Sequence, residues 1–322
     1  MKMEDILKLL GDSWTGYKDL VRTTLRSNID ALDILNADLL SNTGKQLRPA
    51  LSLLMSNTCG GCSADSLHYA AASEVLHNAT LFHDDVADGS STRRGKPSLA
   101  STVGPRAAVL VGDFWLSKAI CLVLGTKHQN RAILLFSGTL GNLAEGEMLQ
   151  LHKSAGADTT EDDYKRIIYC KTASLFETSC RSAALSMDAP ALQFEAAGSY
   201  GAALGMAFQI KDDILDYLGG DGIGKPVGED LAAGLLTLPL LGALRSCGDP
   251  SSLRAKVLKI KEQPELSEEL RQYVLDNGGI EYASSVLDEY VDEALDALSV
   301  FPQSPWKDAL VQIARYNAVR ES

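Results

Sequence analysis

The chain has 322 residues, of which 45% are hydrophobic and 22% are charged, values that are typical of a soluble globular protein and exclude extended disorder. Its net charge of −12 at pH 7 disfavours nucleic acid and strongly anionic membranes as electrostatic partners. An anionic ligand would therefore have to be bound by local basic clusters or through bridging cations.

A single domain over residues 1–322 is expected, because no Pro/Gly/Ser-rich linker and no sustained charge run divides the chain. Glu4 and Asp5 stand where a signal peptide would have its apolar run. The longest uncharged stretches are shorter than a membrane span and contain glycines. These features predict a cytoplasmic protein with at most peripheral membrane contact.

Helical periodicity runs through nearly the whole chain, with apolar residues three and four positions apart. Runs of alternating, β-branched residues are missing, and short clusters of Gly, Pro, Asn or Asp separate the periodic segments. The prediction is an all-α bundle of ten or more helices. In chain order the predicted helices are 4–10, 19–40, 66–86, 106–124, 131–151, 161–184, 194–218, 236–244, 252–260, 267–277, 280–298 and 305–319.

Residues 196–210 are rich in Ala, Gly and Leu on more than one face of their predicted helix. A helix that is apolar all round is usually buried. Two explanations stay open at this point, a central position in a large bundle and a surface shared with a second subunit.

Residues 81–88 place three carboxylates at the end of a predicted helix. Asp84 and Asp88 share one face, because residues four apart lie about 40° apart around a helix, and Asp85 lies to the side. Mutual repulsion and the helix macrodipole both disfavour acids there. Divalent cations would remove both penalties, and ligands that are all oxygen favour magnesium over zinc. A merely solvated acidic helix end is the alternative.

A basic loop follows this motif directly. Arg93, Arg94 and Lys96 lie among glycine and hydroxyl residues between Gly89 and Pro97. Arginine offers a planar fork of donors that can bind two phosphate oxygens. Acids that bind metal next to bases that bind phosphate predict a diphosphate site.

The acidic pattern is repeated in residues 209–216, where Asp212, Asp213 and Asp216 end an otherwise apolar helix. Two such motifs facing each other would hold several metal ions around one diphosphate. The glycine-rich segment that follows lets Lys225 approach a phosphate. It is not a P-loop, because Pro226 replaces the Ser or Thr and no strand precedes it.

Together these segments resemble the trans-type polyprenyl diphosphate synthase family, and most closely its medium- and long-chain branch. The two aspartate-rich motifs of the family match 84–88 and 212–216, and its isopentenyl diphosphate motif matches 44–49. Further signatures match the pair Lys171-Thr172 and the segment 225–239. The sequence departs from the family at Leu235, where a lysine is usual.

The resemblance implies a bundle of the isoprenoid synthase type with a central active-site cavity. It implies a trans-prenyltransferase that condenses isopentenyl diphosphate with an allylic prenyl diphosphate into a longer all-trans polyprenyl diphosphate, of the kind that is a precursor of quinone side chains. Magnesium, with three ions per active site, is the implied cofactor, and a homodimer is the implied assembly.

The resemblance also implies roles for individual residues. Isopentenyl diphosphate would be bound by Lys45, Arg48, His77 and Arg94. The allylic diphosphate would be bound by Arg93, Lys171, Thr172, Gln209 and Lys225. Magnesium would be bound, directly or through water, by Asp84, Asp85, Asp88, Asp212, Asp213 and Asp216. The residues expected to act in catalysis itself are Asp84, Asp88, Lys171, Thr172, Gln209 and Asp212.

Chain length is the least determined property. With a rise of about 1.5 Å per residue, Thr80 and Ala79 lie about 6–7 Å below Asp84 on its helix, and Leu76 lies further down. Small residues there leave room for a growing tail, and Trp115 on another helix could wall the tunnel. We therefore predict a medium- to long-chain product, with a short-chain farnesyl or geranylgeranyl diphosphate synthase as the alternative.

The motifs disfavour two other protein classes. A class I terpene cyclase would not need Lys45 and Arg48, and its second metal motif differs from 212–216. A non-catalytic partner subunit of a two-component synthase would be expected to lose one or both aspartate motifs, and here both are intact.

Overall fold

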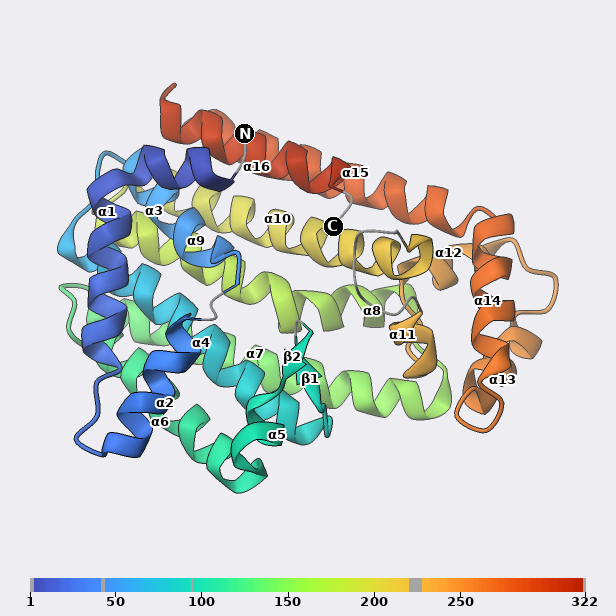
Figure 1. Cartoon of the computed structure of the whole chain (residues 1–322). Coiled ribbons are helices and arrows are strands. Elements are labelled where there is room, and N and C mark those ends of the chain that lie inside the picture. Colours follow the sequence, from blue (N-terminus) through green and yellow to red (C-terminus); the bar gives the residue numbers. More distant parts are fainter. Residues whose placement is uncertain (1–2, 42–43, 94, 220–227, 321–322) are drawn as a thin grey trace. The chain divides into compact units, whose positions relative to one another are not determined.

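The structure is a computed structural model that describes residues 3–41, 44–93, 95–219 and 228–320. Within these ranges the chain is helical apart from one short hairpin, which confirms the predicted all-α class (Figure 1). The α-helices are α1 Met3–Thr24, α2 Asp30–Ser41, α3 Leu47–Thr58, α4 Ala64–Ala87, α5 Leu99–Val103, α6 Pro105–Leu124, α7 Gln129–Gly156, α8 Glu161–Ile168, α9 Ser174–Ser186, α10 Ala191–Leu218, α11 Glu229–Ala232, α12 Leu238–Arg245, α13 Pro250–Lys259, α14 Glu265–Asp276, α15 Gly279–Ala297 and α16 Pro305–Val319.

The chain forms two compact units, each built from three separate segments. Unit 1 comprises Met1–Ser137, Leu175–Gly198 and Leu298–Gln312, and unit 2 comprises Gly138–Ser174, Ser199–Ala297 and Ile313–Ser322. Neither unit is a contiguous half of the sequence. The single domain over residues 1–322 therefore stays a prediction.

Unit 1 is organised around α4, which packs against α1, α3, α5 and α6. The helix begins at a capping box, in which Ser63 and Ser66 exchange side-chain and backbone hydrogen bonds. Most of its length is buried because small residues, Ala70 to Ser73, let neighbouring helices approach closely. On α6, Trp115 packs edge-on against Phe82 of α4 with ring centroids 5.2 Å apart.

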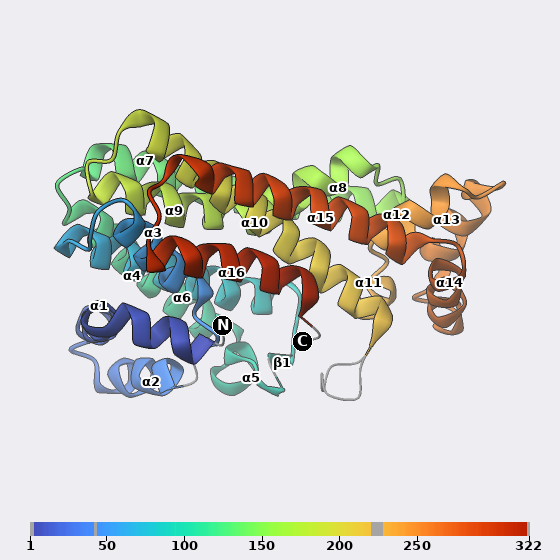
Figure 2. The ribbon, with the colours of Figure 1, turned by 90° about the horizontal axis from the view of Figure 1, so that it is seen from above.

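Unit 2 has its own apolar core. The side chains of α12 are buried along nearly the whole helix, which packs against α14 and along α15 (Figure 2). The part of α10 that belongs to this unit contributes Met206, Ala207, Ile210 and Ile214 to the same core. Burial of this segment agrees with its apolar residues on every face, and the carboxylates of the second aspartate motif follow at its end.

Several predicted boundaries were wrong. The predicted helices 4–10 and 19–40 do not match the observed ones. Helix α1 spans Met3–Thr24 with a kink at Gly11, whose φ is 49°, and the chain leaves the helix between α1 and α2, inside the predicted segment 19–40. Helix α3 was missed because it is buried on almost every face, from Pro49 to Ser56, and so lacks a polar stripe. The hairpin of β1 (Thr92–Arg93) and β2 (Lys96–Pro97) is too short to show a period of two.

Candidate active site

The first aspartate motif lies at the carboxyl end of α4 in unit 1, as predicted. Asp88 is the C-cap residue and is exposed, whereas Asp84 is half-buried. Asp85 is only 2% exposed, and its Oδ1 accepts a hydrogen bond of 2.7 Å from Nε of Arg93 in β1. The hairpin therefore folds the basic loop back onto the acids, and Arg93 neutralises the one carboxylate that points inward.

The residues expected to bind isopentenyl diphosphate also lie in unit 1. His77 is half-buried on α4, seven positions before Asp84 and therefore within about 20° of it around the helix. Arg48 is in α3, which packs on α4, and its guanidinium lies 4.7 Å above the ring of Phe176. Lys45 is exposed just before α3. Arg94 lies outside the described residues.

The chain-length residues divide between two sides of α4. Ala79 is fully buried and three positions before Phe82, so it lies on the side that Trp115 contacts. Thr80 is half-buried and lies within about 40° of Asp84. Leu76 is buried one turn further down. Trp115 is anchored because its Nε1 donates to Oδ1 of Asn36 at 2.9 Å. Whether these residues wall a tunnel stays a prediction.

The second aspartate motif ends α10 in unit 2, and all three carboxylates are bound by protein groups. Oδ1 of Asp212 accepts a hydrogen bond of 2.6 Å from Arg320. The two oxygens of Asp216 accept the backbone N–H groups of Glu229 and Asp230, each at 3.1 Å, and thereby cap the N-terminus of α11. Asp213 points inward and is 3% exposed.

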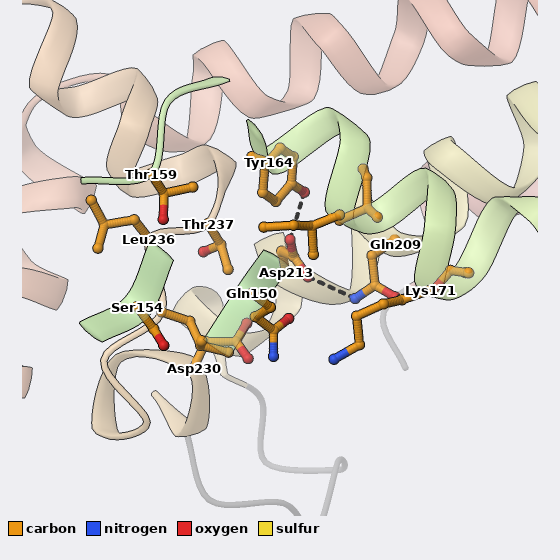
Figure 3. Close-up of a pocket in the computed structure, with 14 residues that line it drawn as sticks. Gln150, Ser154, Thr159, Tyr164, Lys171, Gln209, Asp213, Asp230, Leu236 and Thr237 are labelled. Atoms are coloured by element: carbon orange, nitrogen blue, oxygen red, sulfur yellow. Dashed lines mark hydrogen bonds between the residues drawn. The ribbon is translucent and has the colours of Figure 1, made fainter. Parts of the chain in front are cut away.

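A pocket of about 270 Å³ opens beside this motif in unit 2 (Figure 3). Lys171, Thr172, Gln209 and Asp213, which were predicted as site residues, all line it. Its apolar wall is formed by Ile167, Ile168, Leu235 and Leu236. Lys225 lies outside the described residues.

A chain of hydrogen bonds links the polar residues of this pocket. Thr172 Oγ1 donates to Gln209 Oε1 at 2.8 Å, and Gln209 Nε2 donates to Asp213 Oδ1 at 2.9 Å. The hydroxyl of Tyr164 in α8 donates to Asp213 Oδ2 at 2.5 Å (Figure 3). Asp213 thus fixes the amide of Gln209, which in turn orients the hydroxyl of Thr172.

Two acids, the buried Asp213 and the half-buried Asp230, give the pocket an unusual electrostatic character. Burial raises the pKa of Asp213 well above its usual value, and the charge of Asp230 acts in the same direction, against the hydrogen bonds from Tyr164 and Gln209. Burial also raises the pKa of Asp230 to about 7, with Asp216 as the next contributor. Cations or protons must therefore compensate this acidic cluster.

We expect Asp230→Asn to stabilise the chelated protein, and the gain to depend on pH. When folding raises the pKa of a carboxyl group, ionisation of that group destabilises the folded state. The loss of unfolding free energy therefore grows as pH rises from about 4 to about 7 and is then constant. Thermal unfolding in EDTA should show the variant melting about 2–6 °C higher at pH 8. The difference should vanish near pH 4, and exposed Asp292→Asn should show no such trend. Equal melting temperatures of Asp230→Asn and the wild-type chain at pH 8 would contradict the raised pKa that we assign to Asp230.

Lys171 and Thr172 lie in a π-helical turn, Tyr169–Ala173, that interrupts the predicted helix 161–184. The wider turn places both side chains at the pocket, and such turns are frequent at functional sites. Lys171 also forms an ion pair with Glu147 of α7. The turn packs so closely on Gly146 that a Cβ there would lie 2.7 Å from Cys170 Cβ and 2.9 Å from Lys171 Cγ.

Gly146→Ala should therefore displace Lys171. We expect kcat/KM to fall about tenfold to a hundredfold, since small misplacements of binding groups have effects of this size, together with a lower melting temperature. Gly141→Ala is the matched control on the same helix, because nothing lies within 4 Å of the added Cβ. The control should keep full activity and gain about 0.5–1 kcal/mol in unfolding free energy. Equal kinetics in the two variants would contradict the role of the close contact.

The described residues contain no group of three His, Cys, Asp or Glu side chains that could by themselves hold a metal ion. The donor set nevertheless fits magnesium, which is commonly bound by one or two carboxylates together with water and substrate phosphates. Of the carboxylates in the two motifs, Asp88 is exposed and Asp84 and Asp212 are half-buried, the side chain of Asp212 being 43% exposed.

Comparisons with known proteins identify the family. The sequence model described as polyprenyl synthetase matches residues 31–275. Octaprenyl diphosphate synthase of Escherichia coli is 34% identical over the full length of both chains. The crystal structure of a decaprenyl diphosphate synthase from Rhodobacter capsulatus superposes with a TM-score of 0.93 at 31% identity, and covers all of both chains. The chain belongs to the polyprenyl synthetase family. This confirms the predicted family, its medium- to long-chain branch and the enzyme class, a trans-prenyltransferase.

A further relative bears on the metal. The polyprenyl synthase of Caulobacter crescentus, 32% identical with a TM-score of 0.91 over 100% of this chain and 98% of that one, was crystallised with calcium and isoprenyl diphosphate. Dependence on metal is general in the family.

Four residues of the site escaped prediction. Glu147, Tyr164 and Asp230 touch the pocket or its lysine, and Arg320 binds the second motif. Glu147, Tyr164 and Arg320 lie far along the chain from the residues that they contact, so spacing could not reveal them. Asp230 follows the glycine-rich segment closely. An acidic residue between that segment and Thr237 could have been predicted to lie at the phosphate-binding pocket.

Proposed function

We propose that the chain condenses isopentenyl diphosphate with an allylic prenyl diphosphate in the presence of Mg²⁺, and that it repeats the step until an all-trans product of about eight to ten prenyl units is formed. The observation that carries this proposal is the unit 2 pocket, where Lys171 and the linked pair Thr172–Gln209 lie beside the second aspartate motif. The octaprenyl and decaprenyl products named for two relatives support the length.

In this proposal Asp84, Asp88 and Asp212 bind the metal ions directly, three ions in all. Asp85 supports them by holding Arg93, and Asp216 by capping α11. Asp213 acts through Gln209. Bound magnesium would neutralise the allylic diphosphate and make it a better leaving group.

The residues of the pocket then divide the chemistry. Lys171 binds the allylic diphosphate as the C–O bond breaks and the bonding electrons leave with the diphosphate. Thr172 and Gln209 direct oxygen lone pairs towards the allylic cation, and the apolar wall around Leu236 excludes the water that would trap the cation as an alcohol. The double bond of isopentenyl diphosphate, held by Lys45 and Arg48, attacks the cation, and the released diphosphate takes the proton.

The exposed face of α6 supports the proposed homodimer. Val109, Leu110, Ile120 and Leu124 are 37–62% exposed on this helix. By length and composition α6 could also cross a membrane, a test that core helices of soluble proteins pass as well. These apolar side chains surround Asp113, which is 61% exposed on the same face. Exposed apolar side chains on one face often mark a binding surface, and a second copy of this chain in the cytoplasm is the proposed partner.

Two-substrate kinetics tests the assignment of the two diphosphates. Lys45→Met should raise KM for isopentenyl diphosphate at least tenfold and leave KM for the allylic starter nearly unchanged, since a charge-assisted hydrogen bond is worth about 1.5–3 kcal/mol. Lys171→Met should raise KM for the allylic starter and leave KM for isopentenyl diphosphate nearly unchanged. If both variants raise the same KM, the proposed division of the substrates between the two groups of residues is wrong.

A further inference from the structure

The C-terminal turn, residues 316–320 at the end of α16 and just after it, is held by one buried arginine. The side chain of Arg320 is 7% exposed, and its guanidinium lies 4.3 Å above the ring of Phe208. Its Nη2 donates to the carbonyl oxygen of Phe208 at 3.0 Å and to Oδ1 of Asp212 at 2.6 Å. Its Nε donates to Oδ1 of Asn317 at 3.0 Å. All of these residues belong to unit 2.

The contacts of Arg320 with Phe208, Asp212 and Asn317, which we call the clamp, depend on the charge of Asp212. A guanidinium stays protonated, so a buried one requires a compensating anion. Within the described residues, the carboxylate paired with Arg320 is that of Asp212. Among the described residues, the amide nitrogen of Asn317 is buried without a hydrogen-bond partner. The ion pair with Asp212 thus compensates the charge of Arg320, while Phe208 and Asn317 provide its neutral contacts.

We propose that Arg320 is a latch that holds the C-terminal turn on Asp212 and that releases it when a divalent cation binds the same carboxylate. The inference rests on the proposed function, in which Asp212 is a metal ligand. Arg320 binds Oδ1 of Asp212, so a cation bound to the same carboxylate would lie close to the guanidinium, and the two positive charges would repel each other. Seating of the turn and binding of the cation therefore oppose each other, and this coupling is reciprocal.

Removal of Arg320 should accordingly strengthen metal binding. We would titrate Mn²⁺ as a spectroscopic substitute for Mg²⁺ into the wild-type chain, Arg320→Met and Arg315→Met, and would count free Mn²⁺ by electron paramagnetic resonance. Arg315 is exposed in α16, five residues before Arg320, so its variant loses the same charge without touching Asp212. We expect Arg320→Met to bind Mn²⁺ about fivefold more tightly or better, and Arg315→Met to stay within about twofold of wild type. Equal affinities in the two variants would overturn the latch.

Hydrogen exchange of the wild-type chain provides a readout that requires no substitution near the clamp. Mn²⁺ should speed the exchange of the backbone amides of residues 316–320 about threefold or more. Unchanged or slower exchange would overturn the latch. Asp212→Asn separates the two proposals. If it leaves Mn²⁺ affinity intact, the metal role of Asp212 fails. If it weakens the affinity while Arg320→Met binds as wild type does, only the latch fails.

Discussion

Asp84→Asn is expected to lower the rate of condensation about 1,000-fold or more at saturating Mg²⁺, with little change in melting temperature. The substitution keeps the size of the side chain but removes the anionic oxygen that we assign to the metal, and loss of one electrostatic contact to the developing charge has effects of this order. Because Asp84 is half-buried at a helix end where acids are disfavoured, the asparagine should be tolerated structurally.

The rate can be followed as incorporation of labelled isopentenyl diphosphate over a range of Mg²⁺ concentrations. Asp12→Asn, an exposed aspartate on α1, controls for loss of one negative charge and should turn over normally. The assignment of the first motif to metal would be abandoned if Asp84→Asn retained more than about a tenth of the wild-type rate at every metal concentration.

Ala79→Phe should shorten the product sharply, to about C15 or C20. Ala79 is fully buried about 7.5 Å below Asp84, so a phenyl ring at this position would form a floor after one or two additions. Ala79→Val should give an intermediate length. Overpacking of a buried alanine can cost about 1–3 kcal/mol, so the melting temperature of each variant is measured in parallel.

Thr80→Phe offers a second route to the same test. Thr80 is half-buried and nearer the face of Asp84, where a ring is easier to accommodate. Mass spectrometry of the products from all three variants, with one allylic starter, gives the length distributions directly. If both phenylalanine variants fold and still make the wild-type product, the growing chain does not pass beside this turn of α4.

Most of the fold could be predicted from the sequence, because a helix with one solvent-exposed face has apolar residues at three- and four-residue spacings. Helix α6 begins at Pro105 and α15 begins after Asn277 and Gly278, at two of the Gly, Pro or Asn clusters that separate the periodic segments of the sequence. This periodicity fails where burial is complete, as in α3, and where elements are too short, as in the hairpin around Arg93. The π-helical turn at Lys171 was not predicted, because a single turn of different width leaves the periodicity of the flanking residues almost unchanged; in the structure it lies close to Gly146.

The candidate site was predictable in its residue types and less so in its contacts. The four-residue spacing predicted that Asp84 and Asp88 share one helix face and that Asp212 and Asp216 share another. In the structure the three aspartates of each motif lie at the end of their helix. Spacing could not reveal that Arg93 binds Asp85, that Arg320 binds Asp212, or that Tyr164 holds Asp213, because these are tertiary contacts. The inward turn of Asp213 follows from burial of its helix face and not from the motif.

Leu235 is a specific departure with a physical consequence. It lines the pocket in which Lys171 is the one lysine or arginine among the described lining residues, while Asp213 and Asp230 are acidic. A pocket so poor in positive charge depends on metal to attract a diphosphate. This electrostatic balance agrees with the central role that we propose for magnesium.

The most direct test of the central claim is the product of the purified chain itself. The chain alone is incubated with Mg²⁺, labelled isopentenyl diphosphate and a panel of allylic starters, and the product length is read by mass spectrometry. We predict a ladder that ends in a defined product of about eight to ten prenyl units and that disappears in EDTA. Absence of condensation with every starter, in a folded protein supplied with Mg²⁺, would contradict the proposed reaction and favour a non-catalytic partner subunit.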